Sequence, residues 1–278
     1  AYCMPFTLDS IQDLDAVMQR RTAAAESASA SHPCQRLIAY GPDPDHTLDF
    51  YPAQSLDGPS PLVLFIHGGF WRSMRASQFS FLARGFVDQG VSLAVIDYPL
   101  IPRVRMEQVV HACRLALAHV LAHSHEMGID ADRVVVAGNS AGGHLVAELM
   151  DTHWMAAMGL PDTCLRGGVA ISGLYDLVPV ALSVQNESLH LTAEETSRYS
   201  PLIRSVHIRA PLVLAVGGDE TSEFLRQTAA FAAHAQAHGT PTQHLVVPHT
   251  NHITVVLDGL ARRDNALNVA THYLLSGN

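Results

Sequence analysis

The chain has 278 residues, of which 48% are hydrophobic, so it can bury a large core, most simply as one α/β domain over residues 1–278. Its 17 basic and 26 acidic residues give a net charge of -9 without any run of like charge, which disfavours a nucleic-acid partner. No apolar stretch approaches the length of a membrane span, and the first residues lack a basic region and an apolar signal core. We therefore expect a soluble, cytoplasmic protein with no membrane partner.

The four cysteines are too few for a disulfide framework in a chain of this length. Cys113 falls on the apolar face of a predicted helix, which is typical of a buried free thiol. Pairing of Cys3 with Cys34 stays open.

The first predicted elements are a helix and a hairpin. The helix covers residues 9–26 and is capped by Asp9 or Ser10, with a linker or frayed end in the Ala/Ser tract that reaches residue 31. The two strands of the hairpin fall at residues 35–40 and 47–51, and the alternation in the second strand suits an antiparallel strand at a sheet edge.

Strands and helices then alternate along the chain. Apolar runs predict strands at residues 62–66, 91–97, 133–137, 167–172, 212–217 and 242–247. Helical patterns fall at residues 77–89, 105–127, 222–238 and 264–275. This order predicts a mostly parallel, doubly wound sheet with helices on both faces and functional groups at the carboxyl ends of the strands.

One segment, residues 175–210, interrupts the alternation. It contains a capping box, Thr192 with Glu195, that predicts a short helix. An insertion after the carboxyl end of a strand lies over the functional edge of the sheet, so this segment is predicted to be a small cap that forms a lid or pocket wall.

The sharpest signal is a Gly-x-Ser-x-Gly sequence at residues 138–142, between a β-branched apolar run and a helical pattern. A serine at so tight a strand-to-helix turn has a strained backbone, and side chains at Gly138 and Gly142 would collide with the neighbouring strand and helix. The start of the following helix directs free N–H groups toward the same place. Ser140 is therefore predicted to be a nucleophile.

A second glycine pair, Gly68 and Gly69, follows the predicted central strand. Glycines at the carboxyl end of such a strand let main-chain N–H groups approach a ligand. In hydrolases of this layout, such a loop supplies half of the oxyanion hole and the residue after the nucleophile supplies the rest. We expect Gly68, Gly69, Phe70 and Ala141 to form this hole.

A serine nucleophile needs a base, and the base needs a carboxylate that fixes its tautomer. In the fold predicted here the acid comes first in the sequence, and the strand that ends in Gly217 and Gly218 makes Asp219 and Glu220 the best candidates. Counting three residues from the first glycine selects Glu220, with Asp219 a competitor. For the base we select His252, with His249 the alternative.

The grouping of His244, His249 and His252 with Asp219 fits no common zinc pattern, so neither a metal nor an organic cofactor is expected. Phe70, Trp71, Tyr98 and Tyr175 are candidates for an aromatic substrate pocket, although packing in the core explains each of them equally well.

Five motifs together point to a family: HGGFW at residues 67–71, DYPLIP at 97–102, GNSAGGH at 138–144, SGLYDL at 172–177 and SEFLRQ at 222–227. With them the chain resembles the α/β-hydrolase superfamily and, within it, the arylformamidase (kynurenine formamidase) family of serine hydrolases. The resemblance implies Ser140, Glu220 and His252 as the catalytic triad.

Two positions depart from the family pattern, because Asn139 and Ile253 stand where family members commonly carry histidine and phenylalanine. The substrate therefore need not be the usual one of the family.

The expected reaction is hydrolysis of a small, aromatic amide or ester through an acyl-enzyme. An arylformamidase-like amidase acting on N-formyl or N-acyl arylamines is the first interpretation. A carboxylesterase for small aryl or alkyl esters is the second, and a non-catalytic binding protein on a hydrolase scaffold is the third. The sequence leaves the oligomeric state open and is compatible with a homodimer.

Overall fold

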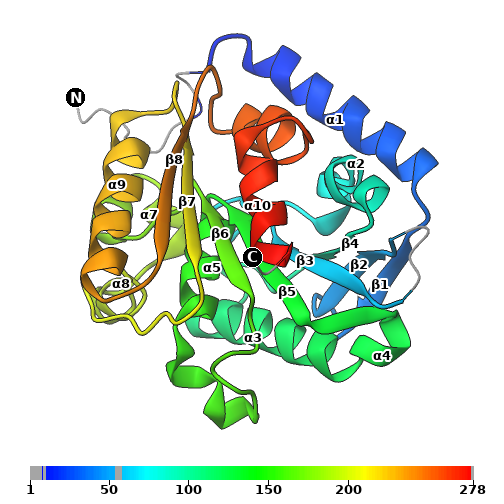
Figure 1. Ribbon diagram of the computed structural model, residues 1–278. Helices are drawn as coiled ribbons and strands as arrows, with labels where there is room; N and C mark the ends of the chain where they lie inside the picture. The colour runs from blue at the N-terminus through cyan, green and yellow to red at the C-terminus, as the bar shows by residue number, and fades with distance from the viewer. Residues whose placement is uncertain (1–7, 9–10, 54–57, 277–278) are drawn as a thin grey trace.

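The sheet at the centre of the molecule is mostly parallel. The computed structural model describes residues 8, 11–53 and 58–276. Across these ranges eight strands form one sheet, in the order β1-β2-β4-β3-β5-β6-β7-β8 (Figure 1). β1 pairs antiparallel with β2, and β2 with β4, while every later pair is parallel. The strands are β1 (Gln35–Ala39), β2 (Thr47–Tyr51), β3 (Ser60–Ile66), β4 (Ser92–Ile96), β5 (Ile129–Asn139), β6 (Gly167–Ile171), β7 (Leu212–Gly217) and β8 (Thr242–Val247).

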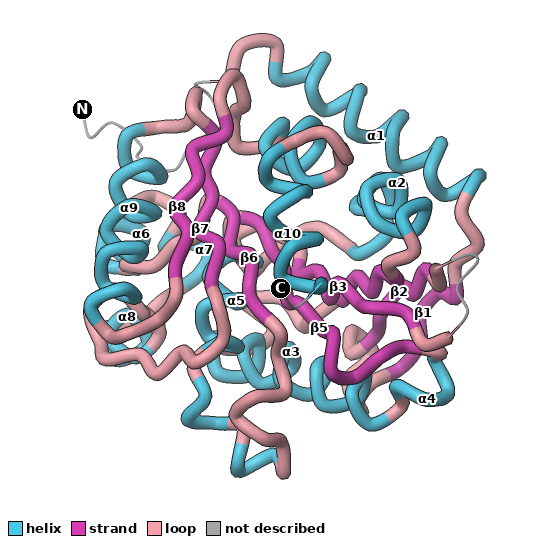
Figure 2. The backbone as a smooth tube through the Cα atoms, viewed as in Figure 1, coloured by secondary structure: helices cyan, strands magenta, loops and turns pink. Residues whose placement is uncertain are grey.

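Helices cover both faces of this sheet, as Figures 1 and 2 show, and the predicted fold class is confirmed. The α-helices are α1 (Leu14–Ser31), α2 (Ala83–Phe86), α3 (Met106–Ala122), α4 (Ser124–Met127), α5 (Ala141–Met150), α6 (Val178–Ala181), α7 (Asn186–Leu189), α8 (Ala193–Arg198), α9 (Ser222–Ala237) and α10 (Ala266–Ser276). Short 3₁₀ turns lie at η1 (Ala76–Leu82), η2 (Val87–Gln89), η3 (Thr152–Trp154) and η4 (Ala156–Met158), and η5 (Val255–Leu260) is a π-helix.

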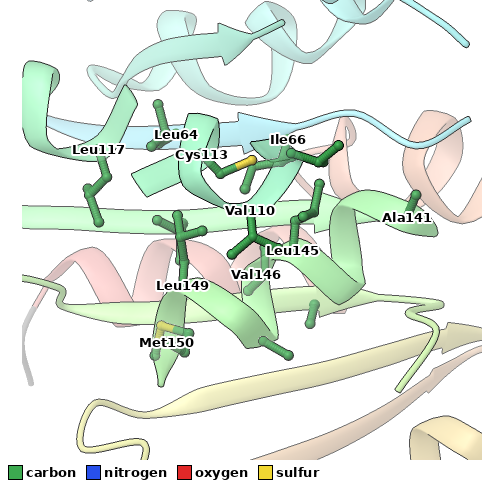
Figure 3. Close-up of a cluster of buried hydrophobic side chains, with 14 of the residues drawn as sticks. Leu64, Ile66, Val110, Cys113, Leu117, Ala141, Leu145, Val146, Leu149 and Met150 are labelled. Carbon is green, nitrogen blue, oxygen red and sulfur yellow. The ribbon is translucent and has the colours of Figure 1, made fainter. Parts of the chain in front are cut away.

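The packing of the central strand β3 explains why its sequence is apolar from Leu62 to Ile66. Leu64 and Ile66 pack in the core layer that contains α3 and α5, whereas Val63 and Phe65 pack in the opposite layer with η1 and α10. Figure 3 shows the first layer, where Leu145 and Leu149 of α5 lie among side chains of β3 and α3. A strand buried on both faces needs apolar residues at every position rather than at alternate ones.

The layer in Figure 3 also contains Cys113, which is fully buried as predicted. Cys3, the other member of the pair left open with Cys34, lies outside the described residues.

The first helix departs from its predicted limits. α1 begins at Leu14 and continues to Ser31, through the Ala/Ser tract that was predicted as a linker or frayed end, while the predicted caps Asp9 and Ser10 lie outside the described residues. Alanine is the strongest helix former, and Ala28 is buried against the body of the protein. The Ser80 hydroxyl also donates a 2.7 Å hydrogen bond to the Ala25 carbonyl. Tertiary packing therefore extends the helix beyond its amphipathic part.

Three other predictions change in detail. The segment 77–89 forms η1, α2 and η2 rather than one α-helix, and the helix predicted over 105–127 is interrupted at His123. The second strand is not at the edge, because β1 covers it, and its Asp49 is buried beside Arg36 at 2.7 Å.

The insertion 175–210 carries α6, α7 and α8. The predicted capping box is confirmed, since the Glu195 N–H donates to the Thr192 hydroxyl at 3.1 Å and the Thr192 N–H donates to Glu195 at 3.0 Å. Arg105, just before α3, also contacts Glu195 at 3.0 Å and holds the insertion against the body of the protein. Of the helices in the described ranges, none is long and apolar enough to cross a lipid bilayer.

Candidate active site

Ser140 lies in a strained turn between β5 and α5. Its φ of 60° and ψ of -120° are unfavourable for a residue with a side chain, and its N–H donates a 2.8 Å hydrogen bond to the Ile171 carbonyl of the next strand. Glycines on both sides make the turn possible. A Cβ on Gly142 would lie 2.0 Å from the Ile66 carbonyl oxygen, and one on Gly138 would lie 2.4 Å from the Gly142 oxygen. This is the geometry that the Gly-x-Ser-x-Gly sequence predicts.

The main chain around Ser140 offers free donors. Ala141 is the first residue of α5, so its N–H has no partner within the helix. The loop after β3 passes against the serine, because a Cβ on Gly68 would lie 3.1 Å from the Ser140 Cβ. Gly69 and Phe70 have positive φ, and their N–H groups meet no hydrogen-bond acceptor within the ranges given above. The site can therefore direct several N–H groups at an oxyanion.

His67 fixes the conformation of this loop. Its Nδ1–H donates a 2.8 Å hydrogen bond to the Gly68 carbonyl, and its ring stacks on Tyr98 with centroids 4.4 Å apart. The Tyr98 hydroxyl in turn donates to the His67 carbonyl at 2.9 Å.

Glu220 and His252 meet directly. The Nδ1–H of His252 donates a 2.6 Å hydrogen bond to Oε2 of Glu220. The other carboxylate oxygen of Glu220 accepts from the Gly217 N–H at 2.7 Å and from the Ser172 hydroxyl. The Glu220 side chain is fully buried, and these three hydrogen bonds fix the position of its carboxylate. Because the carboxylate accepts the proton on Nδ1 of His252, Nε2 of the same ring is left free to accept a proton.

The two alternatives point away from this contact. Asp219 is exposed, and its N–H donates to the Thr250 carbonyl at 2.9 Å. His249 is also exposed. His252 is instead stacked on Phe224, with ring centroids 4.3 Å apart. The structure thus brings Glu220, and not Asp219, to His252.

A cavity of about 100 Å³ joins the serine to the imidazole. Ser140 and His252 line it together with Gly68, Gly69 and Phe70. The remaining walls are mainly apolar and consist of Leu8, Met18, Arg21, Met74, Phe79, Phe81, Asn139, Phe224, Ile253 and Val256.

The wall of this cavity comes from an unexpected part of the chain. No residue of the insertion 175–210 lines it, which corrects the prediction of a lid or pocket wall there, and Met18 and Arg21 of α1 contribute instead. The insertion packs beside the loop after β3, where Arg72 donates a 2.7 Å hydrogen bond to Gln185. The insertion is therefore held against the loop after β3 and does not form a wall of the cavity at Ser140.

The predicted pocket residues Trp71, Tyr98 and Tyr175 are core residues. All three are fully buried, and none lines the cavity around Ser140. Tyr98 supports the His67 loop, and Tyr175 stacks on Phe231 with centroids 4.4 Å apart. This corrects the prediction for these three side chains, because their aromatic surface is already covered by protein.

Trp71 contacts α5, the helix that follows Ser140, through His144. Its Nε1–H donates a 3.2 Å hydrogen bond to Nδ1 of His144, whose Nε2–H donates to the Tyr199 carbonyl at 2.8 Å. This pair of bonds requires a neutral imidazole, and burial lowers the pKa of His144 to about 4. His144 is thus a structural link between α5 and the insertion.

Sequence reasoning missed two contributors. The Ser172 hydroxyl, directly after β6, donates to the Glu220 carboxylate. The sequence signal for this role was the position of Ser172 at the end of a predicted strand. Arg21 continues the stripe of Val17 and Met18 along α1, so the helical spacing was a usable signal for it.

The four candidate zinc ligands do not come together. His244, His249 and Asp219 are exposed while His252 faces Glu220, and the ranges that the structure covers contain no group of three or more potential ligands.

The comparisons with known proteins find similar sequences among hydrolases. A family model described as BD-FAE matches residues 48–157. The chain is 28% identical over 226 residues to a kynurenine formamidase of Salmo salar, covering 79% of this chain and 74% of that protein. It is 25% identical over 245 residues to a probable isoprenylcysteine alpha-carbonyl methylesterase of Arabidopsis thaliana, covering 80% of this chain and 52% of that protein.

Solved structures show the same fold. A putative thioesterase from Silicibacter sp. TM1040 superposes with a TM-score of 0.80 at 26% identity, covering 98% of this chain and 97% of the other. Esterase LipW from Mycobacterium marinum superposes with a TM-score of 0.75 at 18% identity, covering 99% of this chain and 92% of the other. The chain therefore has the α/β-hydrolase fold, and its sequence is similar to those of kynurenine formamidases and esterases.

Proposed function

We propose that the protein hydrolyses N-formyl or short N-acyl arylamines through a covalent intermediate on Ser140. The observation that supports this most directly is that His252, which is hydrogen bonded to Glu220, lines the same cavity as Ser140 on its strained turn. The relatives named kynurenine formamidase favour an N-formyl arylamine, and the small cavity favours a small acyl group.

The proposed reaction begins when Nε2 of His252 takes the hydroxyl proton of Ser140 as its oxygen attacks the carbonyl carbon. The N–H groups of Ala141 and of Gly69 or Phe70 stabilise the oxyanion, each contributing about 3 kcal/mol of barrier reduction. His252 then protonates the departing arylamine nitrogen. Water, deprotonated by the same imidazole, attacks the acyl-enzyme and releases the acid. Throughout, Glu220 stabilises the imidazolium that forms.

The experiment that tests this function compares N-formylkynurenine, acetanilides and p-nitrophenyl esters as substrates, with Ser140→Ala as the blank. We expect the variant to lose at least about a thousandfold in turnover on every substrate, because the covalent route is gone. Residual turnover within tenfold of the parent would refute the assignment of Ser140. A fluorophosphonate should label the parent and leave the variant unlabelled.

A carboxylesterase is the second candidate, and a specific observation favours it. The methylesterase relative of Arabidopsis thaliana is similar in sequence over 80% of this chain, and the esterase structures share the fold over most of it. A kcat/KM for p-nitrophenyl acetate that far exceeds the value for every formamide and anilide would select the esterase over the amidase.

A further inference from the structure

Among the described residues, the guanidinium of Arg21 lines the cavity without an acidic partner. Arg21 of α1 is only 6% exposed and lines the cavity together with Ser140 and His252. Within the ranges that the structure describes, its guanidinium has neither a hydrogen bond nor an ion pair. The guanidinium carbon Cζ lies over the Phe79 ring, 5.7 Å from the ring centroid. The neighbouring Arg20, by contrast, is exposed and binds Asp258 at 2.8 Å.

Burying a guanidinium without a partner lowers the stability of the folded protein. Burial lowers the pKa of Arg21, yet arginine stays protonated in proteins, so the charge remains in the cavity. Buried charges are normally paired, and a ring face compensates a cation only in part. A guanidinium that lacks a protein partner and faces a cavity is the arrangement expected where an anion binds.

Asn139 provides a second, independent sign of a ligand. It is 7% exposed, precedes Ser140 and lines the same cavity. Its side-chain Nδ2 is buried and has no hydrogen-bond partner in the part of the chain that the structure describes. Two polar side chains that are more than nine-tenths buried therefore offer unused donors to one cavity. A ligand with acceptor oxygens satisfies both.

The other walls define the rest of the ligand. Phe70, Phe79, Phe81 and Phe224 line the cavity, and the lining residues that the structure describes include no carboxylate side chain. Apolar and aromatic walls around a single cation suit a flat, apolar group that carries a negative charge. A neutral or cationic aryl group would leave the guanidinium unpaired.

We propose that Arg21 is a specificity-determining residue that binds a carboxylate on the aromatic leaving group of the substrate. This inference rests on the proposed function for its place in the reaction and names the substrate class as N-acyl arylamines with a carboxylate. The planar guanidinium binds the carboxylate through two parallel N–H···O contacts, and the substrate ring lies among the phenylalanines.

The test measures kcat/KM for the three formamidobenzoate isomers, for their methyl esters and for formanilide. The parent should prefer at least one carboxylate over its methyl ester by about tenfold to a hundredfold, the range expected for a charge-assisted pair. Arg21→Met should abolish this preference through a higher KM for the carboxylate, because its kcat/KM should fall at least about tenfold more for the carboxylate than for formanilide. Arg20→Met is the matched control, because it removes the same charge from the next position of α1 and should keep the preference.

A second measurement separates this inference from the proposed function. Binding of the aminobenzoates to the Ser140→Ala protein needs no turnover, so calorimetric titration reports on Arg21 whether or not formamides are substrates. We expect binding to weaken at least tenfold when Arg21→Met is added, and aniline to bind both proteins equally. Arg21→Gln is measured alongside, so a methionine variant that fails to fold does not remove the test.

Equal carboxylate preference in the parent and both Arg21 variants, with unchanged aminobenzoate binding, would overturn the role of Arg21. A parallel loss of activity on charged and neutral substrates would also overturn it, because it indicates a structural role. Intact, Arg21-dependent binding of aminobenzoate without hydrolysis of any formamide would support the anion subsite and refute the formamidase assignment.

Discussion

The contact of Glu220 with His252 leads to a quantitative prediction for Glu220→Gln. The Gly217 N–H can only donate, so the amide must turn its carbonyl oxygen toward Gly217 and Ser172. Its NH₂ group then faces Nδ1 of His252 and forces that nitrogen to accept. The imidazole proton consequently moves to Nε2, the nitrogen that has to take the proton of Ser140.

We expect Glu220→Gln to lower kcat by about 10⁴-fold, or about 5 kcal/mol of transition-state stabilisation, as for other triads forced into the wrong tautomer. The protein should stay folded with a loss of about 1 to 2 kcal/mol, because the oxygen facing Gly217 still accepts its hydrogen bond. The assay combines steady-state hydrolysis of the best substrate with urea unfolding of the same samples. Asp219→Asn is the control and should keep kcat within about twofold, since Asp219 is exposed. A Glu220→Gln enzyme within tenfold of the parent, or an Asp219→Asn enzyme with the larger loss, would refute the reasoning.

Two further predictions concern the support of the nucleophile. Gly142→Ala places a Cβ 2.0 Å from a backbone oxygen and should destabilise the fold by about 3 kcal/mol and abolish activity. The control is Gly259→Ala, whose Cβ would lie 3.6 Å from the Leu267 side chain and should leave the urea midpoint of unfolding at the parent's value. Equal midpoints for the two variants would contradict the predicted clash at Gly142. For His144, whose pKa is lowered to about 4, the unfolded chain binds a proton between pH 6.5 and 4 that the folded protein does not, so stability is lost as the pH falls through this window, by about 3 kcal/mol in total. The stability advantage of the parent over His144→Gln, measured by urea unfolding at pH 7 and pH 4.5, should therefore shrink in acid, and an advantage independent of pH would contradict the assignment.

The positions of the candidate catalytic residues were predictable because these residues follow the ends of strands. The Gly-x-Ser-x-Gly turn, the glycines at Gly68 and Gly69 and the acid after Gly217 each follow an apolar strand, and a parallel sheet brings such ends to one edge. Where two neighbours competed, as with Asp219 and Glu220, the strand count and the resemblance selected the residue that contacts His252.

The pocket was not predictable in the same way. Trp71 and Tyr175 lie next to the correct motifs, but side-chain direction depends on packing that the sequence pattern does not contain, and both side chains turn into the core. The wall provided by α1 depends on contacts between segments far apart in sequence. One of these contacts is the hydrogen bond between Ser80 and the Ala25 carbonyl.

The position of α1 separates recognition from chemistry. The groups assigned to bond cleavage follow β5, β7 and β8 of the sheet, whereas Met18 and Arg21 reach the cavity from α1, on the outside of the molecule. We therefore expect a substitution in that helix to alter which substrates the cavity accepts without disturbing the strained serine turn or the buried carboxylate. Divergence among proteins with this architecture can therefore proceed through one peripheral helix while the machinery beneath it stays the same.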